Sequence, residues 1–143
     1  MAAVARRRGI GMGLLPLLLA VGCGGTPPPF APVKGKVSYQ GRPLTTGTIV
    51  FTPDPVRGTS GPLARADIQP DGSYQLKSSE QAGAVPGWHR VTVLAIDAAP
   101  QWNSQQPVVP RSLIPPRYSD PSLSGLAREV KPGEENTLNF DLE

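Results

Sequence analysis

Proline is the residue type that most restricts how this chain can fold. The 143-residue sequence contains 18 prolines and 16 glycines, with few strong helix formers in any window. A proline inside an α-helix removes a backbone hydrogen bond and costs roughly 3 kcal/mol, which disfavours helices along most of the chain. The sequence therefore predicts short strands joined by turns, and its length is that of one ordinary domain of about 100 to 150 residues.

The first 22 residues have the three parts of an export signal. Residues 6–8 are arginines, residues 14–19 are mostly leucine, and small residues precede Cys23. The stretch between the arginines and Cys23 is shorter than the roughly 20 apolar residues that a transmembrane helix needs. We therefore expect a cleaved signal peptide over residues 1–22.

Cys23 is the single cysteine of the chain. Residues 19–22, Leu-Ala-Val-Gly, resemble the lipobox that precedes the lipid-modified cysteine of bacterial lipoproteins, although Ala20 stands where that motif usually has leucine. A lone cysteine cannot form an internal disulfide, so we expect Cys23 to carry diacylglycerol and acyl chains such as palmitate. The alternative is an ordinary secretory signal cut near Gly22 or Gly25, with Cys23 unmodified.

A short tether is expected to connect Cys23 to the folded region. Residues 24–32 are rich in glycine and proline, and a polyproline conformation gives them a reach of roughly 25 Å. We therefore expect residues 23–32 to hold a domain of residues 33–143 close to a membrane. Gly24 stands where an aspartate commonly marks inner-membrane retention, so the expected location is the outer membrane of the cell envelope.

The charge balance excludes one class of partner. The chain has 14 basic and 11 acidic residues, and three of the basic residues belong to the expected signal peptide. The remaining basic and acidic residues are equal in number, and the lysines and arginines are scattered singly along the sequence. Such a chain has no basic stripe for a phosphate backbone, so we expect no nucleic-acid partner.

Alternation of apolar and polar residues predicts about seven strands. They cover residues 33–39, 48–52, 64–68, 74–76, 88–96, 126–130 and 138–142. The turn at residues 70–72 predicts a hairpin of the third and fourth strands, and the apolar run within residues 88–96 predicts a central strand covered on both faces. We expect a seven-stranded antiparallel β-sandwich with a long proline-rich loop before the last strands.

The order of several motifs resembles the carboxypeptidase regulatory-like domain, a transthyretin-type sandwich, in the form found in small bacterial lipoproteins. The resemblance is carried by residues 33–37, 41–44, 47–51, 71–76, 86–93, 114–121, 124–126 and 139–142. It implies an accessory, structural or binding module without catalytic residues.

The sequence offers little for catalysis or metal binding. It contains one histidine, His89, which we expect on a strand surface, and no serine lies in a nucleophile elbow. Asp67 and Asp71 suggest a calcium loop, but the later glutamate of such a loop is missing. A turn explains them better, with Asp71 accepting backbone hydrogen bonds and Gly72 at positive φ. We therefore expect no enzyme, no metal and no other cofactor.

The loop at residues 98–125 is the best candidate binding surface, because connections above about 12 to 15 residues are often functional. It contains Trp102 close to the side-chain amides of Asn103, Gln105 and Gln106, a composition suited to stacking on a sugar and hydrogen-bonding it. The alternative is a loop that packs along the sandwich edge and hides unpaired strand groups. The apolar anchors in that case are Ile114, Tyr118 and Leu123.

Two functions follow from these observations. The first is a membrane-anchored envelope lipoprotein that acts as a structural or protein-interaction module without catalysis. The second is a carbohydrate- or peptide-binding lipoprotein, in which the ligand is an envelope glycan or protein. Its candidate ligand-binding residues are Trp88, Trp102, Tyr118 and the loop at residues 98–125. A small envelope hydrolase is a third class, and the single histidine disfavours it.

Overall fold

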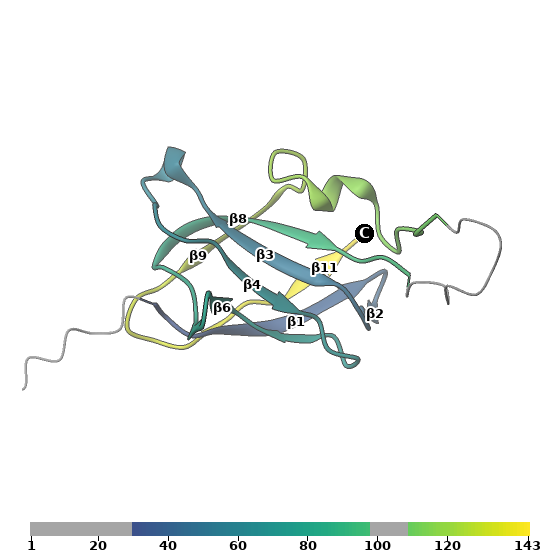
Figure 1. The fold of residues 1–143 in the computed structure, drawn as a ribbon, viewed down its shortest axis with the longest axis horizontal. Helices are drawn as coiled ribbons and strands as arrows, with labels where there is room; N and C mark the ends of the chain where they lie inside the picture. Colours follow the sequence, from purple (N-terminus) through teal and green to yellow (C-terminus); the bar gives the residue numbers. More distant parts are fainter. Residues whose placement is uncertain (1–29, 98–108) are drawn as a thin grey trace, which may run out of the picture.

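Two open β-sheets lie face to face in this protein, which confirms an all-β, sandwich-like fold (Figure 1). The structure is a computed structural model that describes residues 30–97 and 109–143. Sheet 1 contains β1 (Val33–Tyr39), β2 (Arg42–Pro43), β5 (Ser73–Gln75), β10 (Asn136–Thr137) and β11 (Phe140–Leu142). Sheet 2 runs in the order β7 (Gln81–Ala82), β6 (Lys77–Ser78), β4 (Ala64–Asp67), β3 (Thr48–Pro53), β8 (Gly87–Leu94), β9 (Leu126–Val130). Two short 3-10 helices are η1 (Pro55–Arg57) and η2 (Pro116–Ser119).

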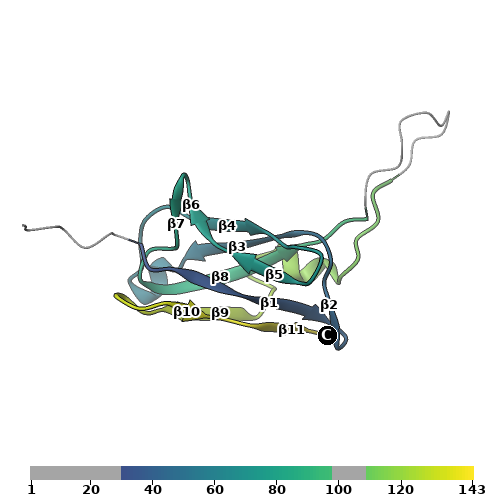
Figure 2. The same cartoon turned by 90° about the horizontal axis from the view of Figure 1, so that it is seen from below.

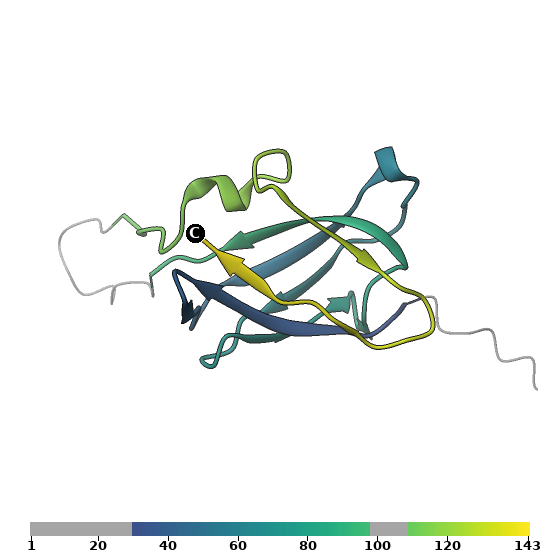
Figure 3. The same ribbon diagram turned by 180° about the vertical axis from the view of Figure 1, so that it is seen from behind.

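The first strand, β1, is the centre of sheet 1. It pairs antiparallel with β2 and β5, and parallel with β10 and β11. Figure 3 shows the yellow C-terminal segment running beside the blue first strand. The sandwich is therefore not purely antiparallel as predicted. The described residues also form eleven strands rather than about seven, because four of the strands have only two residues and give no alternation in the sequence.

The hairpin predicted around residues 70–72 has its turn but not its pairing. Gln69 N donates to the Ser73 carbonyl at 2.8 Å. Asp71 Oδ1 accepts from Ser73 N at 3.0 Å, and Gly72 has a φ of 84°, which confirms their predicted roles. Beyond the turn, β4 stays beside β3 in sheet 2 whereas β5 crosses to β1 in sheet 1. The last two predicted strands, at residues 126–130 and 138–142, also lie in different sheets, since β9 pairs with β8 and β11 pairs with β1.

The eight-residue strand β8 lies between β3 and β9. Its inner face carries His89, Val91 and Val93, which are at most 1% exposed. The helix η2 packs against the strand, but on the outer face Leu94 is 50% exposed, and Ile96, just beyond the strand, is 44% exposed. The prediction of a strand covered on both faces is therefore wrong at this end, because no second layer extends over it.

An aromatic cluster joins the two sheets at the centre of the core. The ring centroid of Phe51 lies 6.4 Å from that of Tyr74 and 5.9 Å from that of Phe140, both of which belong to sheet 1. His89, on the neighbouring strand of sheet 2, lies 5.8 Å from Phe51. All four side chains are at most 3% exposed. Contacts between aromatic rings at these separations contribute roughly 0.5–1.5 kcal/mol beyond the burial of their surface.

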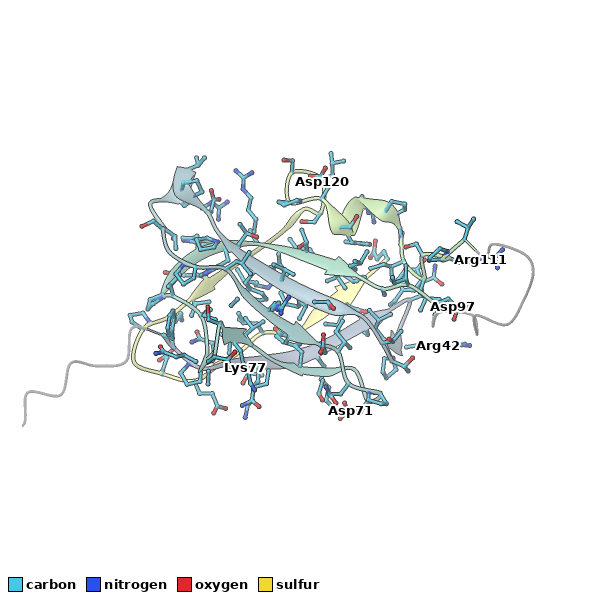
Figure 4. All side chains as sticks on the ribbon, in the orientation of Figure 1. Arg42, Asp71, Lys77, Asp97, Arg111 and Asp120 are labelled. Carbon is cyan, nitrogen blue, oxygen red and sulfur yellow. The ribbon has the colours of Figure 1, made fainter. Side chains whose placement is uncertain are left out.

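The two ends of the long axis differ in what they carry (Figure 1). At one end the chain enters the domain through Ala31, which is 2% exposed and bridged to Ala84, so packing begins before β1. At the other end lie Asp97 and Arg111 (Figure 4), and Asp97 N donates to the Arg111 carbonyl at 2.8 Å. The base of the loop that follows β8 is therefore tied by backbone hydrogen bonds at the end far from Ala31.

Candidate binding groove

A wide open groove of about 1450 Å³ lies on the side of the molecule where the two sheets part. One wall is formed by the outer faces of β1 and β5 and by the segment that joins β10 to β11. The other wall is formed by β4 and the turn between β6 and β7. Figure 2 looks onto this side and shows β5 between β4 and β1. The volume exceeds that of a typical enclosed small-molecule pocket, roughly 300–1,000 Å³, so the groove suits an extended ligand.

The groove exists because β4 and β5 separate after sharing a turn. The gap between them is closed at one end by the hydrogen bond from Gln69 to Ser73, and at the other end by the pairing of Arg65 with Lys77. Between these points no strand pairing joins β4 to β5 in the described residues. Because both ends are closed, a ligand cannot insert as an added strand between β4 and β5, and it must bind through the side chains that line the groove.

Polar side chains cover the sheet 1 wall in two cross-strand rows. In the first row, Lys34 is paired with Gln75 on β5 and with Thr137 on β10. In the second row, Lys36 is paired with Ser73 on β5. Residues two apart on one strand share a face and lie about 7 Å from each other, so the two lysines form an evenly spaced pair.

The charges along the groove are unequal. Its basic residues are Lys34, Lys36, Arg65 and Lys77, and its acidic residues are Asp67 and Glu80. Lys34 forms a salt bridge with Glu135, whereas none of the salt bridges among the described residues involves the other three basic side chains. The fold thus gathers from three strands the cations that the sequence scatters singly. The only local signal in the sequence is the alternation of the two lysines with buried residues of β1.

Among the described residues, the structure does not bring the predicted ligand-binding residues Trp88 and Tyr118 together. Cys23 and Trp102 lie outside the described residues. Trp88 stands at the start of β8 beside η1, whereas Tyr118 belongs to η2, and neither lines the groove.

Trp88 is held by the loop that follows β3. The guanidinium carbon of Arg57 lies 4.3 Å from the centroid of the Trp88 ring and covers one of its faces. Trp88 N donates to Thr59 Oγ1 at 2.8 Å. Asp54 is 5% exposed, and its Oδ2 lies 3.8 Å from Arg57 and 3.5 Å from Arg90. Trp88 therefore packs the loop against β8, and a sugar has no free access to the face that Arg57 covers.

Tyr118 is a packing residue in η2. It is 5% exposed, and its hydroxyl donates to the Glu143 carbonyl at 3.1 Å and accepts from Glu143 N at 3.0 Å. Ile114 is also 5% exposed, but Leu123 is 64% exposed and does not act as an anchor. The described part of the loop at residues 98–125 thus packs against β8 and the residue after β11. The pairing of β8 with β9 ends at Val91. Beyond that point η2 contacts β8, and Leu113 N donates to the Ala95 carbonyl at 2.9 Å, as the edge-packing alternative predicts.

His89 is enclosed in the core, so the prediction of a strand-surface histidine is wrong. The pattern was ambiguous because His89 alternates with Trp88 and Arg90, and the structure turns the histidine inward. Its Nδ1 donates to the Gly87 carbonyl at 3.0 Å, and its Nε2 is buried without a hydrogen-bond partner. Burial lowers the pKa of His89, and the hydrogen bond to Gly87 opposes this effect. A histidine in this position cannot reach a substrate.

His89 should make the stability of the domain depend on pH. Above about pH 6.5 the histidine is neutral in both the folded and the unfolded chain. Because burial lowers its pKa in the folded state, the unfolded chain binds a proton first as the pH falls. The free energy of unfolding should therefore fall, by up to about 1.4 kcal/mol per pH unit, from about pH 6.5 down to the folded-state pKa.

Urea unfolding of the protein and of His89→Phe between about pH 5 and pH 8 tests this expectation. The variant keeps a ring against Phe51 and removes the titrating group, so its stability should change less with pH over this range. The chain has no second histidine that could supply the same slope. An equal slope in the two proteins would contradict the assignment.

The described part of the chain holds no metal-binding cluster and no membrane-spanning helix. Within residues 30–97 and 109–143, no three His, Cys, Asp or Glu side chains are placed to hold a metal ion. No helix in these two segments is long and apolar enough to cross a membrane.

Comparisons with known proteins assign no family. No protein-family model, no curated protein and no solved structure matches this chain. The groove is therefore interpreted from its own residues and geometry.

Proposed function

We propose that this protein is a lipoprotein of the bacterial cell envelope that binds an extended segment of another envelope protein and performs no catalysis. Acyl chains on Cys23 hold it to the membrane, and the groove between β4 and β5 receives the partner. The observation that carries the proposal is the groove itself, a wide surface that carries several charged and polar side chains, beside two strands that share a turn but no pairing.

The sequence before the domain supports the anchor. A basic cluster, an apolar stretch and small residues lead to a cysteine for which the chain has no disulfide partner. Two or three acyl chains give stable attachment, since each buried methylene contributes about 0.8 kcal/mol. Gly24 favours the outer membrane. The short tether places the end of the domain that carries Ala31 next to the lipid surface, and the groove runs along the side of the molecule.

The make-up of the groove supports binding over catalysis. Its described lining contains lysine, arginine, carboxylate, amide and hydroxyl groups, and it has no histidine or cysteine that would activate a nucleophile. The same lining argues for a peptide over a sugar, because its one aromatic residue, Tyr74, is 3% exposed. The Tyr74 hydroxyl is also occupied, since it donates to the Leu138 carbonyl at 2.5 Å.

A finer fold assignment belongs to the same proposal. We propose that the two-sheet domain is of the transthyretin type seen in carboxypeptidase regulatory-like domains. The motif order in the sequence supports this assignment, and the all-β sandwich is compatible with it. An accessory binding role is what such a module implies.

The anchor is tested on the protein expressed in bacteria from its full sequence. Intact mass should show diacylglycerol on an N-terminal Cys23, and the protein should partition into the detergent phase. Cys23→Ser should lose both properties while the domain unfolds at the same temperature. An unmodified Cys23 in the wild-type protein would refute the lipid anchor.

The groove is tested in the same cells by photo-crosslinking. A photoreactive amino acid replaces an exposed groove residue, Gln75 or Glu80, or an exposed residue outside the groove, Arg42 or Glu134. The groove positions should form a crosslink to one defined envelope protein, identified by mass spectrometry, and the outside positions should not. Equal crosslinking from all four positions, or none from the groove, would remove the groove from the proposal.

A further inference from the structure

We infer that the groove recognises an acidic segment, in which carboxylate side chains alternate with neutral ones along an extended peptide. This inference rests on the proposed function and names the chemistry of the partner. Its basis is the set of three groove cations without a salt bridge among the described residues: Lys36, Arg65 and Lys77.

The cations face the groove from both of its walls. Lys36 projects from the outer face of β1, and Arg65 projects from β4 across the gap. Lys77 stands at the end where β6 rejoins β4, and Figure 4 shows it on the lower side of the molecule. Lys36 and Lys77 are exposed, as is Arg65. A ligand in the groove therefore meets positive charge from both walls.

The nearby carboxylates form no salt bridge with these three cations in the described residues. Asp71 is attracted to Lys36, and its Oδ1 accepts from both Ser73 N and Ser73 Oγ, at 3.0 Å and 2.6 Å. Asp67 accepts from Thr48 Oγ1 at 3.4 Å. Glu80 stands on the turn between β6 and β7, at the rim. Carboxylates of an acidic ligand can pair with Lys36, Arg65 and Lys77. A peptide with an acidic residue at every position would be repelled by Asp67 and Glu80.

The spacing of the two lysines on β1 favours a peptide in which acidic and neutral residues alternate. Lys34 and Lys36 lie on one face of β1, about 7 Å apart, which is also the distance between alternate side chains of an extended peptide. Beside each lysine the neighbouring strand offers a neutral polar side chain, Gln75 or Ser73. A peptide with carboxylates at every second residue therefore matches the lysines, and its contact with Lys34 replaces that of the exposed Glu135. Its intervening neutral side chains point away from this face.

Nucleic acid and acidic glycans fit the same groove less well. Stacking on exposed aromatic rings is the usual means of holding bases and sugars, and the described groove has no exposed ring. Asp67 and Glu80 also repel a continuous run of phosphates. The closed ends of the gap exclude strand addition, so side-chain charge must supply much of the specificity.

The test uses the mature protein in detergent micelles and two short fluorescent peptides, one of alternating Glu and Thr and one of alternating Gln and Thr. Fluorescence anisotropy should show saturable binding of the Glu peptide. The Gln peptide should bind about tenfold more weakly or worse, a difference of about 1.4 kcal/mol. Raising the salt to about 0.5 M should weaken binding of the Glu peptide.

Charge reversal locates the binding. The double variant Lys36→Glu, Arg65→Glu should lose binding of the Glu peptide by more than about tenfold. The matched control, Arg42→Glu with Lys131→Glu, changes the net charge equally at exposed residues outside the groove and should bind as the wild type does. Thermal unfolding of both double variants checks that they are folded.

Three results would overturn the inference: equal binding of the two peptides, equal loss in the two double variants, or no saturable binding of the Glu peptide. The outcome is separable from that of the proposed function. Groove crosslinks to a partner segment without acidic residues would reject the acidic ligand and retain the binding role. Binding of the Glu peptide without groove crosslinks in cells would retain the preference for acidic ligands and reject the proposed binding of an envelope protein.

Discussion

Replacing Gly35 by alanine should destabilise the domain more than any other single-methyl addition on β1. Gly35 faces inward from the middle of the strand, where the ladder to β10 and β11 is interrupted. A Cβ at this position would overlap the Leu138 carbonyl oxygen and lie 2.6 Å from its carbonyl carbon. That carbonyl already accepts a hydrogen bond from the Tyr74 hydroxyl, so it cannot move away freely.

The expected loss is at or above the upper end of the roughly 1–3 kcal/mol that overpacking costs, because backbone rather than a flexible side chain must shift. Urea unfolding measures it. Gly41→Asn is a suitable control, since Gly41 has a φ of 76° and a Cβ added there would meet no neighbour within 4 Å. Asparagine also tolerates this backbone conformation. A Gly35→Ala protein as stable as the control would show that the Leu138 segment is not fixed as described.

Truncating Phe51 to alanine should cost about 3–5 kcal/mol, which is a large part of the roughly 5–15 kcal/mol that stabilises an ordinary domain. Phe51 is 0% exposed and its ring contacts aromatic rings from both sheets. Its removal leaves a cavity at the point where Tyr74, His89 and Phe140 converge. The measurement is the free energy of unfolding in urea, with the m-value checked for a change in compactness.

Two comparisons make the Phe51 result specific. Phe51→Leu keeps most of the apolar volume and should cost less than Phe51→Ala. Val56→Ala truncates a side chain that is 81% exposed and should change stability by less than about 0.5 kcal/mol. A small loss in Phe51→Ala would mean that the aromatic cluster is not the centre of the core.

The strands that the sequence reveals are those with alternation. The bounds of β1 match residues 33–39, and the turn roles of Asp71 and Gly72 are confirmed, because these features depend on neighbours along the chain. Pairing depends on distant contacts instead. The turn at residues 70–72 has the same local chemistry whether the next strand stays beside β4 or crosses to β1, so the sequence alone predicted the commoner hairpin.

The inward turn of His89 follows from the same limit. Successive side chains along residues 88–96 face opposite sides of the strand. Because most of these residues are apolar, the sequence does not show which of the two sets faces the core. The register of β8 with β3 decides it, because Pro53 lies opposite His89 and Phe51 opposite Val91.

The groove could not be predicted, because its cations come from β1, β4 and β6, and only the fold brings these strands to one side. The candidate ligand-binding residues Trp88 and Tyr118 are aromatic, and in the structure each one mainly packs a loop. The roles of Cys23 and Trp102 stay predictions, since both lie outside the described residues.

The parallel pairing of β1 with β10 and β11 has a consequence for biogenesis. Lys36 and Asn139, which are hydrogen-bonded across this pairing, are separated by 103 residues. The edge of β1 that pairs with β10 and β11 therefore stays unpaired until nearly all of the remaining domain has been synthesised. Contacts between residues so far apart in sequence slow folding and prolong the exposure of apolar surface and unpaired strand edges. We therefore expect the domain to complete its fold only after β11 has been synthesised.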